Sequence, residues 1–335
     1  MFKELRKIYN LKSLSLDKLG DKLIYTINNI TYINEKSFNM EMSPLEFSAY
    51  RNRVFYSMNE NLYEIKNCEF VEFIHIQDSD RIHIINENIV LSFKWITRKE
   101  IEYSIYDTNT NLLWKQANNM RITIFENYLL INERFNKKEF IVKDAYTGNV
   151  LWHFSLPEGF KIFSKIQLVE NVLFFTAYKD INRYKKVFGL DIHTGKTLWE
   201  YNFQIPYKEN IIAFHINPEN NLSYGYGGRL YQVFDPVNGK IVFEKDMSDY
   251  YEQGVEPDLH RNSISDGRLW FVSGYGENAK FGAININTHE VEFIQDYPLE
   301  LDYRFHKIIF HQNKLYVSDS GNTLHIFEKT SDEQV

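Results

Sequence analysis

The sequence predicts an all-β fold, a closed β-propeller of four-stranded antiparallel blades, with eight blades by our count and seven as the alternative. Two observations predict it. A nine-residue phrase recurs at intervals of about 40 residues, which is the length of one propeller blade. The composition also favours strands, because aromatic residues make up 16% of the chain and fit a pleated surface. We expect residues 1–335 to form a single domain.

The repeated phrase is clearest as DAYTGNVLW, which starts at Asp144, and as DIHTGKTLW, which starts at Asp191. Its aspartate can accept backbone hydrogen bonds across a tight turn, and its glycine takes the positive φ that ends the turn. Its tryptophan is a large apolar wedge between neighbouring sheets. Each copy therefore predicts the hairpin that joins the two outer strands of a blade. Weaker copies start at Asp107, Asp235 and Asn285.

Degenerate copies of the phrase lie near both ends of the chain, where Asn34, Lys66 and Glu328 take the aspartate position. Too few residues follow Glu328 to form another strand. The segment FKELRKIY, residues 2–9, precedes the first hairpin. We expect it to supply the missing outer strand of the last blade and so to close the ring, because closure removes exposed strand edges.

The pattern D-x-x-T-G-x-x-x-W after an apolar strand resembles the repeat of the pyrroloquinoline-quinone (PQQ)-like propeller superfamily, and the resemblance covers most of the chain. That superfamily includes periplasmic quinoprotein dehydrogenases, a lipoprotein of the outer-membrane β-barrel assembly machinery and many non-catalytic interaction proteins. The motif is structural in all of them. The resemblance therefore implies the fold but does not select a function.

We expect no catalytic residue, no cofactor and no metal site, and interpret the chain as a non-catalytic member. The resemblance to quinoprotein dehydrogenases would imply adjacent cysteines and a calcium carboxylate cluster, but the chain has one cysteine, Cys68. The ten histidines lack the spacing of a zinc site. No GxSxG, HExxH or Walker-type motif occurs. A PQQ-type cofactor-binding enzyme remains the alternative from the enzyme class.

The net charge and the hydropathy of the sequence limit where the protein is expected to act and which partners it is expected to bind. The net charge of -7 argues against a general nucleic-acid binder, which would usually be basic. The first residues lack the apolar run of a signal peptide, and no stretch reaches the roughly 18 apolar residues that a membrane span needs. We therefore expect a cytoplasmic protein with no membrane partner.

The candidate binding surface is the propeller face that carries the loops between the middle strands of each blade and the linkers between blades. Residues 93–100, 133–139 and 177–186 are predicted to be long basic and aromatic loops on this face. Hairpin tips are naturally polar, so the alternative is that these loops are merely solvated and have no binding role. The candidate residues in these loops are Trp95, Arg98, Arg134, Lys138, Tyr178, Arg183 and Tyr184.

The next sector of this face is predicted to have the opposite charge. Its linker, DMSDYYEQGVEPDLHR at residues 246–261, is long, acidic and rich in tyrosine. Tyrosine, tryptophan and arginine are enriched at the energetic centres of protein interfaces, and complementary charge sets specificity. We therefore expect an electrically split protein-binding face. The candidates here are Asp249, Tyr250, Tyr251, Glu252, Glu256 and Asp258, with Tyr224, Tyr226 and Tyr275 in nearby hairpins.

Together these features predict a non-enzymatic propeller that binds another protein. A chain rich in Lys, Asn, Ile and Tyr is typical of bacteria, and PQQ-like propellers of this kind resemble immunity partners of secreted antibacterial toxins. The sharper hypothesis is an immunity protein that occludes a cognate toxin, with the acidic linker against a basic, nucleic-acid-cutting partner. A scaffold for a bacterial assembly is the alternative. Direct nucleic-acid binding is disfavoured, because the acidic sector would repel phosphates.

Overall fold

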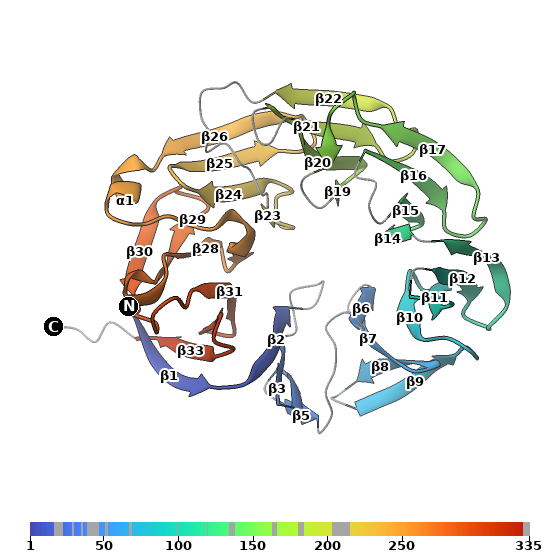
Figure 1. Cartoon of the computed structure of the whole chain (residues 1–335), viewed down its shortest axis with the longest axis horizontal. Helices are drawn as coiled ribbons and strands as arrows, with labels where there is room; N and C mark the ends of the chain where they lie inside the picture. The colour runs from blue at the N-terminus through green and yellow to red at the C-terminus, as the bar shows by residue number, and fades with distance from the viewer. Residues whose placement is uncertain are drawn as a thin grey trace. The chain divides into compact units, whose positions relative to one another are not determined.

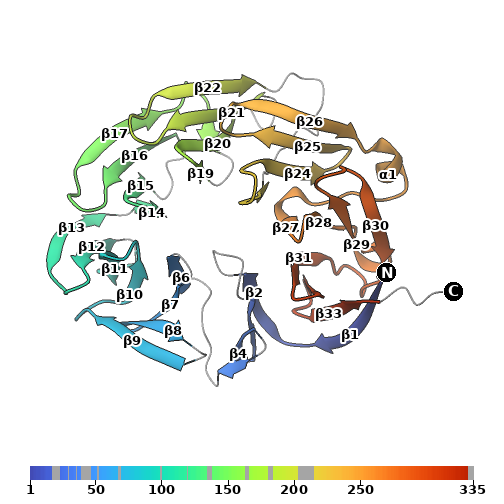
Figure 2. The ribbon, with the colours of Figure 1, turned by 180° about the vertical axis from the view of Figure 1, so that it is seen from behind.

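The fold is a β-propeller, and the predicted count of eight blades is confirmed: in the part of the chain that is described, the strands form eight antiparallel sheets (Figures 1 and 2). Seven of these sheets have four strands and the sheet of the fifth blade has five; the last blade borrows one of its four strands from the N-terminus. The computed structural model describes residues 1–16, 23–28, 30–34, 36–38, 47–50, 53–66, 69–98, 100–118, 120–133, 138–162, 166–179, 184–202 and 215–330.

The first four blades follow one another along the chain. Blade 1 consists of β2 (Leu11–Leu16), β3 (Leu23–Ile27), β4 (Ile30–Ile33) and β5 (Lys36–Phe38). Blade 2 consists of β6 (Phe47–Tyr50), β7 (Arg53–Met58), β8 (Asn61–Lys66) and β9 (Glu69–His75). Blade 3 consists of β10 (Arg81–Ile84), β11 (Ile89–Trp95), β12 (Ile101–Asp107) and β13 (Leu112–Asn118). Blade 4 consists of β14 (Met120–Phe125), β15 (Tyr128–Glu133), β16 (Glu139–Asp144) and β17 (Val150–Ser155).

Four more blades follow, and the sheet of the first of them also contains a short strand, β18 (Lys161–Ile162). Blade 5 consists of β19 (Gln167–Val169), β20 (Val172–Lys179), β21 (Tyr184–Asp191) and β22 (Thr197–Asn202). Blade 6 consists of β23 (His215–Ile216), β24 (Ser223–Gly227), β25 (Leu230–Asp235) and β26 (Lys240–Asp246). Blade 7 consists of β27 (Ser263–Ser265), β28 (Arg268–Ser273), β29 (Lys280–Asn285) and β30 (Val291–Asp296). Blade 8 consists of β31 (Phe305–His311), β32 (Lys314–Asp319), β33 (Leu324–Lys329) and β1 (Phe2–Ile8).

In the described part of the chain, three short helices lie in the loops: α1 (Ser248–Glu252), η2 (Leu259–Arg261) and η3 (Gly276–Asn278). Contacts divide the chain into two compact units. The first unit contains Met1–Leu14, Ser164–Leu190 and Thr197–Val335, and the second contains Ser15–Phe163 and Asp191–Lys196. The expectation of a single domain stays a prediction.

The repeated phrase forms the predicted outer hairpin. In blade 4, Oδ1 of Asp144 accepts hydrogen bonds from the backbone N–H of Thr147 at 2.7 Å and from its hydroxyl at 2.9 Å. In the next blade, Asp191 accepts the same two bonds from Thr194, at 2.7 and 2.8 Å. These bonds satisfy polar groups that the turn would otherwise leave unpaired. The local chemistry of the phrase therefore specifies the hairpin.

The tryptophan of each strong copy packs on the glycine of the following turn, which confirms its role as a wedge between blades. Trp152 lies against Gly195, and the indole N–H of Trp152 donates a hydrogen bond to the carbonyl of Ile192 at 2.8 Å. Gly195 has a φ of +69°, and an added Cβ would lie 2.5 Å from Cδ2 of Trp152. The glycine is therefore needed both for its backbone conformation and for the close approach of the ring.

The N-terminal strand completes the last blade, as predicted. Strand β1 pairs antiparallel with β33, with Phe2 opposite Lys329 and Ile8 opposite Leu324, and the two strands lie side by side in Figures 1 and 2. Phe2 is buried among aromatic rings, with its ring centroid 5.4 Å from that of Phe293 and 5.9 Å from that of Trp270. Both backbone pairing and side-chain burial therefore hold the N-terminus in blade 8.

Candidate protein-binding surface

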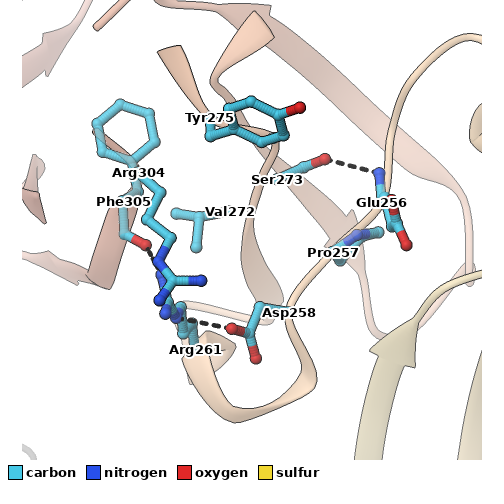
Figure 3. A pocket seen from close by; sticks show the side chains of 10 residues that line it. Glu256, Pro257, Asp258, Arg261, Val272, Ser273, Tyr275, Arg304 and Phe305 are labelled. Atoms are coloured by element: carbon cyan, nitrogen blue, oxygen red, sulfur yellow. Dashed lines mark hydrogen bonds and ion pairs between the residues drawn. The ribbon is translucent and has the colours of Figure 1, made fainter. Parts of the chain in front are cut away.

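A pocket of about 300 Å³ lies in the first unit, where the linker after β26 meets the loop after β28 and the start of β31 (Figure 3). We call it the linker pocket. It brings together three of the residues that the sequence singled out, Glu256, Asp258 and Tyr275. Its full lining is Glu256, Pro257, Asp258, Arg261, Val272, Ser273, Gly274, Tyr275, Arg304 and Phe305.

The linker is held to the core at both ends of α1. Met247 before the helix and Val255 after it are buried in the apolar cluster between blades 6 and 7. Beyond Val255 the chain runs along β28. There the backbone N–H of Glu256 donates to Oγ of Ser273 at 2.6 Å, and Pro257 bridges to the same residue. The linker is therefore long but anchored, and its carboxylates have defined positions.

Asp258 and Arg261 form the floor of the linker pocket. The backbone N–H of His260 donates to Oδ1 of Asp258 at 3.1 Å, which caps η2. Nε of Arg261 lies 2.7 Å from Oδ2 of Asp258, and its Nη1 donates to the carbonyl of Phe305. Burial lowers the pKa of Arg261, although Asp258 acts in the opposite direction. The charge of Arg261 is thus committed to the fold.

Arg304 and Tyr275 form the exposed rim. Among the described residues, the Arg304 guanidinium has no hydrogen bond or ion pair, although its backbone N–H donates to Oγ of Ser320 at 3.1 Å. The Tyr275 side chain is 65% exposed. Figure 3 shows Arg304 and Arg261 on one side of the pocket and Glu256 on the other. A fixed backbone thus presents an exposed ring and an exposed guanidinium beside a concave surface.

The remaining linker candidates lie on α1, away from the pocket lining. Asp249 and Glu252 are exposed, and Tyr250 is half-buried against the core of blades 6 and 7. The ring of Tyr251 lies 4.4 Å from the guanidinium carbon of Arg229, a cation–π contact. These residues belong to the same linker as Glu256 and Asp258 but do not line the pocket.

Two predicted binding residues are core residues instead. Tyr224 is 2% exposed and Tyr226 is 0% exposed, because β24 lies within its blade with the side chains on both of its faces covered. The Tyr226 ring packs edge-on against Phe271, with ring centroids 5.0 Å apart. The prediction that Tyr224 and Tyr226 contact a partner is therefore wrong.

The basic and aromatic loops are described only in part. Trp95 is exposed at the end of β11, where its backbone N–H donates to Oδ2 of Asp80 at 2.6 Å, and Arg98 is exposed in the turn that follows. Lys138 is exposed and Tyr178 is half-buried.

Other predicted loop residues have no side-chain description. Arg134 and Arg183 lie outside the described residues, and only the backbone of Tyr184 is described, as the first residue of β21. The split face stays a prediction, because loops 93–100 and 133–139 belong to the second unit while the linker pocket belongs to the first.

Sequence reasoning missed Arg304, Arg261 and Phe305. Arg304 and Phe305 lie at the end of the linker from blade 7 to blade 8, which leaves the blade at the same end as the acidic linker. A systematic reading of every linker, instead of the longest one, would have included them. Among the described residues, no group of three or more His, Cys, Asp or Glu is placed to hold a metal ion, and no helix is long and apolar enough to cross a membrane.

No family model matches the sequence, and no curated protein matches it significantly. Solved structures match its fold. BamB from Moraxella catarrhalis is 13% identical, with a TM-score of 0.53 over 98% of this chain and 100% of that one. The Cps50 (Swd1) β-propeller domain of Myceliophteria thermophila is 8% identical, with a TM-score of 0.55 over 98% and 100%. A europium-containing methanol dehydrogenase is 9% identical, with a TM-score of 0.50 over 98% and 93%.

These likenesses support the β-propeller fold. At such low identity a shared fold carries no statement about activity, since one fold hosts many functions. The function has to be argued from the surface itself.

Proposed function

We propose that this chain is a non-enzymatic, protein-binding β-propeller whose partner docks on the linker pocket and the helix α1 beside it. The observation that carries the proposal is the exposed pair of Tyr275 and Arg304, held on an anchored backbone beside a concave surface. Tyrosine and arginine dominate the energetics of protein interfaces when they border a pocket that a partner can fill. A pre-organised backbone lowers the entropy that docking would cost.

The polar groups of the linker pocket support binding over catalysis. Ser273 Oγ accepts a hydrogen bond from the backbone N–H of Glu256, and among the described residues no side-chain base is hydrogen-bonded to this hydroxyl. Asp258 and Arg261 are paired with each other. A nucleophilic site would instead place a hydroxyl or thiol within reach of a general base.

Within this function we favour an immunity role in the bacterial cytoplasm, with a cognate toxin as the partner. Asp249, Glu252 and Glu256 give the linker three exposed carboxylates, and such a surface complements a basic, nucleic-acid-cutting enzyme. A scaffold in a bacterial assembly is the second candidate. It would use the same surface, but its partner would not be toxic.

The test is co-purification of this chain with the product of the neighbouring gene, together with growth rescue when both are expressed. We expect a stable complex that Tyr275→Ala and Arg304→Glu each weaken by at least tenfold. The matched controls are Tyr146→Ala, at an outer hairpin, and Arg6→Glu, on the outer strand β1; both residues are exposed. Binding without rescue would favour the scaffold, and the absence of both would remove the toxin hypothesis.

A second measurement addresses the alternative from the enzyme class. Calorimetric titration with PQQ and calcium is expected to give no saturable heat. Saturable binding of PQQ would overturn the non-enzymatic assignment, whatever the outcome of the co-purification.

A further inference from the structure

A second pocket, of about 430 Å³, lies in the first unit beside the linker pocket and shares Arg261 with it. We call it the basic pocket. It is formed by the start of β2, by η2 and by the strands β31 and β32 of blade 8. Its lining is Leu11, Lys12, Ser13, Leu14, His260, Arg261, His306, Lys307, Ser318, Asp319 and Asn322.

The walls of the basic pocket are fixed by hydrogen bonds between distant parts of the chain. The backbone N–H of Leu11 donates to the carbonyl of Asn322 at 2.8 Å. The Lys307 ammonium donates to the carbonyl of Leu14 at 2.8 Å. The start of β2 is therefore tied to β31 and to the turn after β32, so the pocket has a defined shape without any ligand.

The lining of the basic pocket carries an excess of positive charge. Lys12, Arg261 and Lys307 contribute three cations, of which Arg261 is paired with Asp258, and Asp319 contributes the one carboxylate among the lining residues. This carboxylate is 5% exposed and already accepts two hydrogen bonds, one from His325 Nε2 at 2.8 Å and one from the backbone N–H of Thr323 at 2.9 Å. It is therefore committed to its own blade. The excess stands out in a protein whose net charge is -7.

Burial acts against the charged forms of two groups in the lining. Burial lowers the pKa of His306, and the neighbouring cations Arg261 and Arg304 lower it further, although Asp319 and Asp258 act in the opposite direction. Desolvation also lowers the pKa of Lys307. An anion in the pocket would favour the charged form of each group.

The lining also contains a buried hydroxyl group that lacks a hydrogen-bond partner among the described residues. Oγ of Ser13 is buried and, among the described residues, has no hydrogen-bond partner. A buried hydroxyl left unsatisfied costs about 1–3 kcal/mol. Since Ser13 lines the basic pocket, a ligand oxygen at this position would satisfy it.

We infer that the basic pocket binds a small molecule that carries phosphate groups. The volume of about 430 Å³ falls within the range of small-ligand sites, about 300–1,000 Å³. The ammonium groups of Lys12 and Lys307 and the hydroxyl of Ser13 are groups that donate hydrogen bonds to phosphate oxygens. This site is separate from protein docking on the linker pocket.

The experiment is isothermal titration calorimetry of the full chain with pyrophosphate and with ATP, at constant ionic strength, with chloride as the reference anion. Lys307→Gln and Lys12→Gln each remove one positive charge from the lining. We expect saturable binding of at least one probe, weakened about tenfold by each variant. The control Lys3→Gln, an exposed position on β1, is expected to bind like the original chain.

The two probes distinguish the source of the phosphate. Binding of ATP alone would indicate a nucleotide, and equal binding of both probes would indicate recognition of the diphosphate itself. The inference is overturned if neither probe gives saturable heat at millimolar concentration, or if Lys3→Gln weakens binding as much as Lys12→Gln and Lys307→Gln do. Loss of binding in variants that no longer fold is recognised by circular dichroism, and Lys12→Gln, at an exposed position, then remains the test.

Discussion

Nε2 of His325 lies 2.8 Å from Oδ2 of Asp319, and both side chains are 3% exposed. On its other side the imidazole faces the N-terminal strand, with Nδ1 3.3 Å from Oε1 of Glu4. The Tyr297 hydroxyl donates to the same Glu4 oxygen at 2.5 Å. Blade 8 therefore joins its borrowed strand β1 through a buried polar network as well as through backbone pairing. A network of this kind is stabilising only while every member is satisfied.

The first prediction concerns the pH dependence of this network. Burial acts to raise the pKa of Asp319, but the hydrogen bonds from His325 and Thr323 outweigh it and hold that pKa below its ordinary value. The stability contributed by this lowered pKa is therefore fully present above the ordinary value of about 3.9, and it is lost progressively as the pH falls from there through the lower pKa of the folded state. We expect the free energy of unfolding in urea to fall below pH 4.

The variant Asp319→Asn isolates this contribution. At neutral pH it should cost about 1–3 kcal/mol, because the amide offers one acceptor oxygen where the carboxylate accepted buried hydrogen bonds from both His325 and Thr323. Below pH 4 its loss of stability should be shallower than that of the original chain. Urea titrations at several pH values measure both effects, and parallel curves for the two proteins would contradict the prediction.

The second prediction concerns the glycine beneath each tryptophan. Gly195→Ala should destabilise the protein by about 2 kcal/mol or more, since it adds strain at positive φ and forces Trp152 from its place. Gly254→Ala is the matched control, because Gly254 has a φ of +81° and open space around the missing Cβ. It should show only the backbone cost, about 1 kcal/mol. If urea titrations show that Gly195→Ala and Gly254→Ala lose the same free energy of unfolding, then the contact with Trp152 adds no cost to the substitution.

The turn that contains Gly195 could be predicted from the sequence, whereas the burial of the tyrosines of β24 could not. The turn phrase places Asp191, Thr194 and Gly195 within five positions, so its hydrogen bonds and positive φ are local and readable. The burial of Tyr226 depends on the neighbouring blade. All five residues of β24 are buried, so no alternation marks an exposed face. The linker pocket depends in the same way on segments that are distant in sequence.

The third prediction concerns the borrowed strand. Phe2→Ala should cost about 3–5 kcal/mol, because it removes a buried ring that contacts Trp270 and Phe293. Leu5→Ala, at an exposed position of the same strand, should cost less than about 0.5 kcal/mol. In Phe2→Ala, hydrogen exchange should accelerate in β33, the strand with which β1 pairs. Unchanged protection of β33 in Phe2→Ala would mean that β1 does not stabilise blade 8.

The fourth prediction compares two buried tyrosines on the same strand. The hydroxyl of Tyr226 has no hydrogen-bond partner among the described residues, and burial raises its pKa. The hydroxyl of Tyr224 accepts a hydrogen bond from Nδ2 of Asn220 at 2.8 Å. Removing an unsatisfied buried hydroxyl relieves a desolvation cost, whereas removing a bonded one leaves its partner unpaired.

Tyr226→Phe should therefore leave the free energy of unfolding unchanged or raise it by about 1 kcal/mol, while Tyr224→Phe should lower it by about 1 kcal/mol. Because both changes delete one oxygen from the same strand, the difference between them isolates the hydrogen bond. Neither change should alter partner binding, since both side chains are buried. A loss of binding with stability intact would restore these tyrosines to the interface, and equal destabilisation by both would show that Tyr226 has a hydrogen-bond partner.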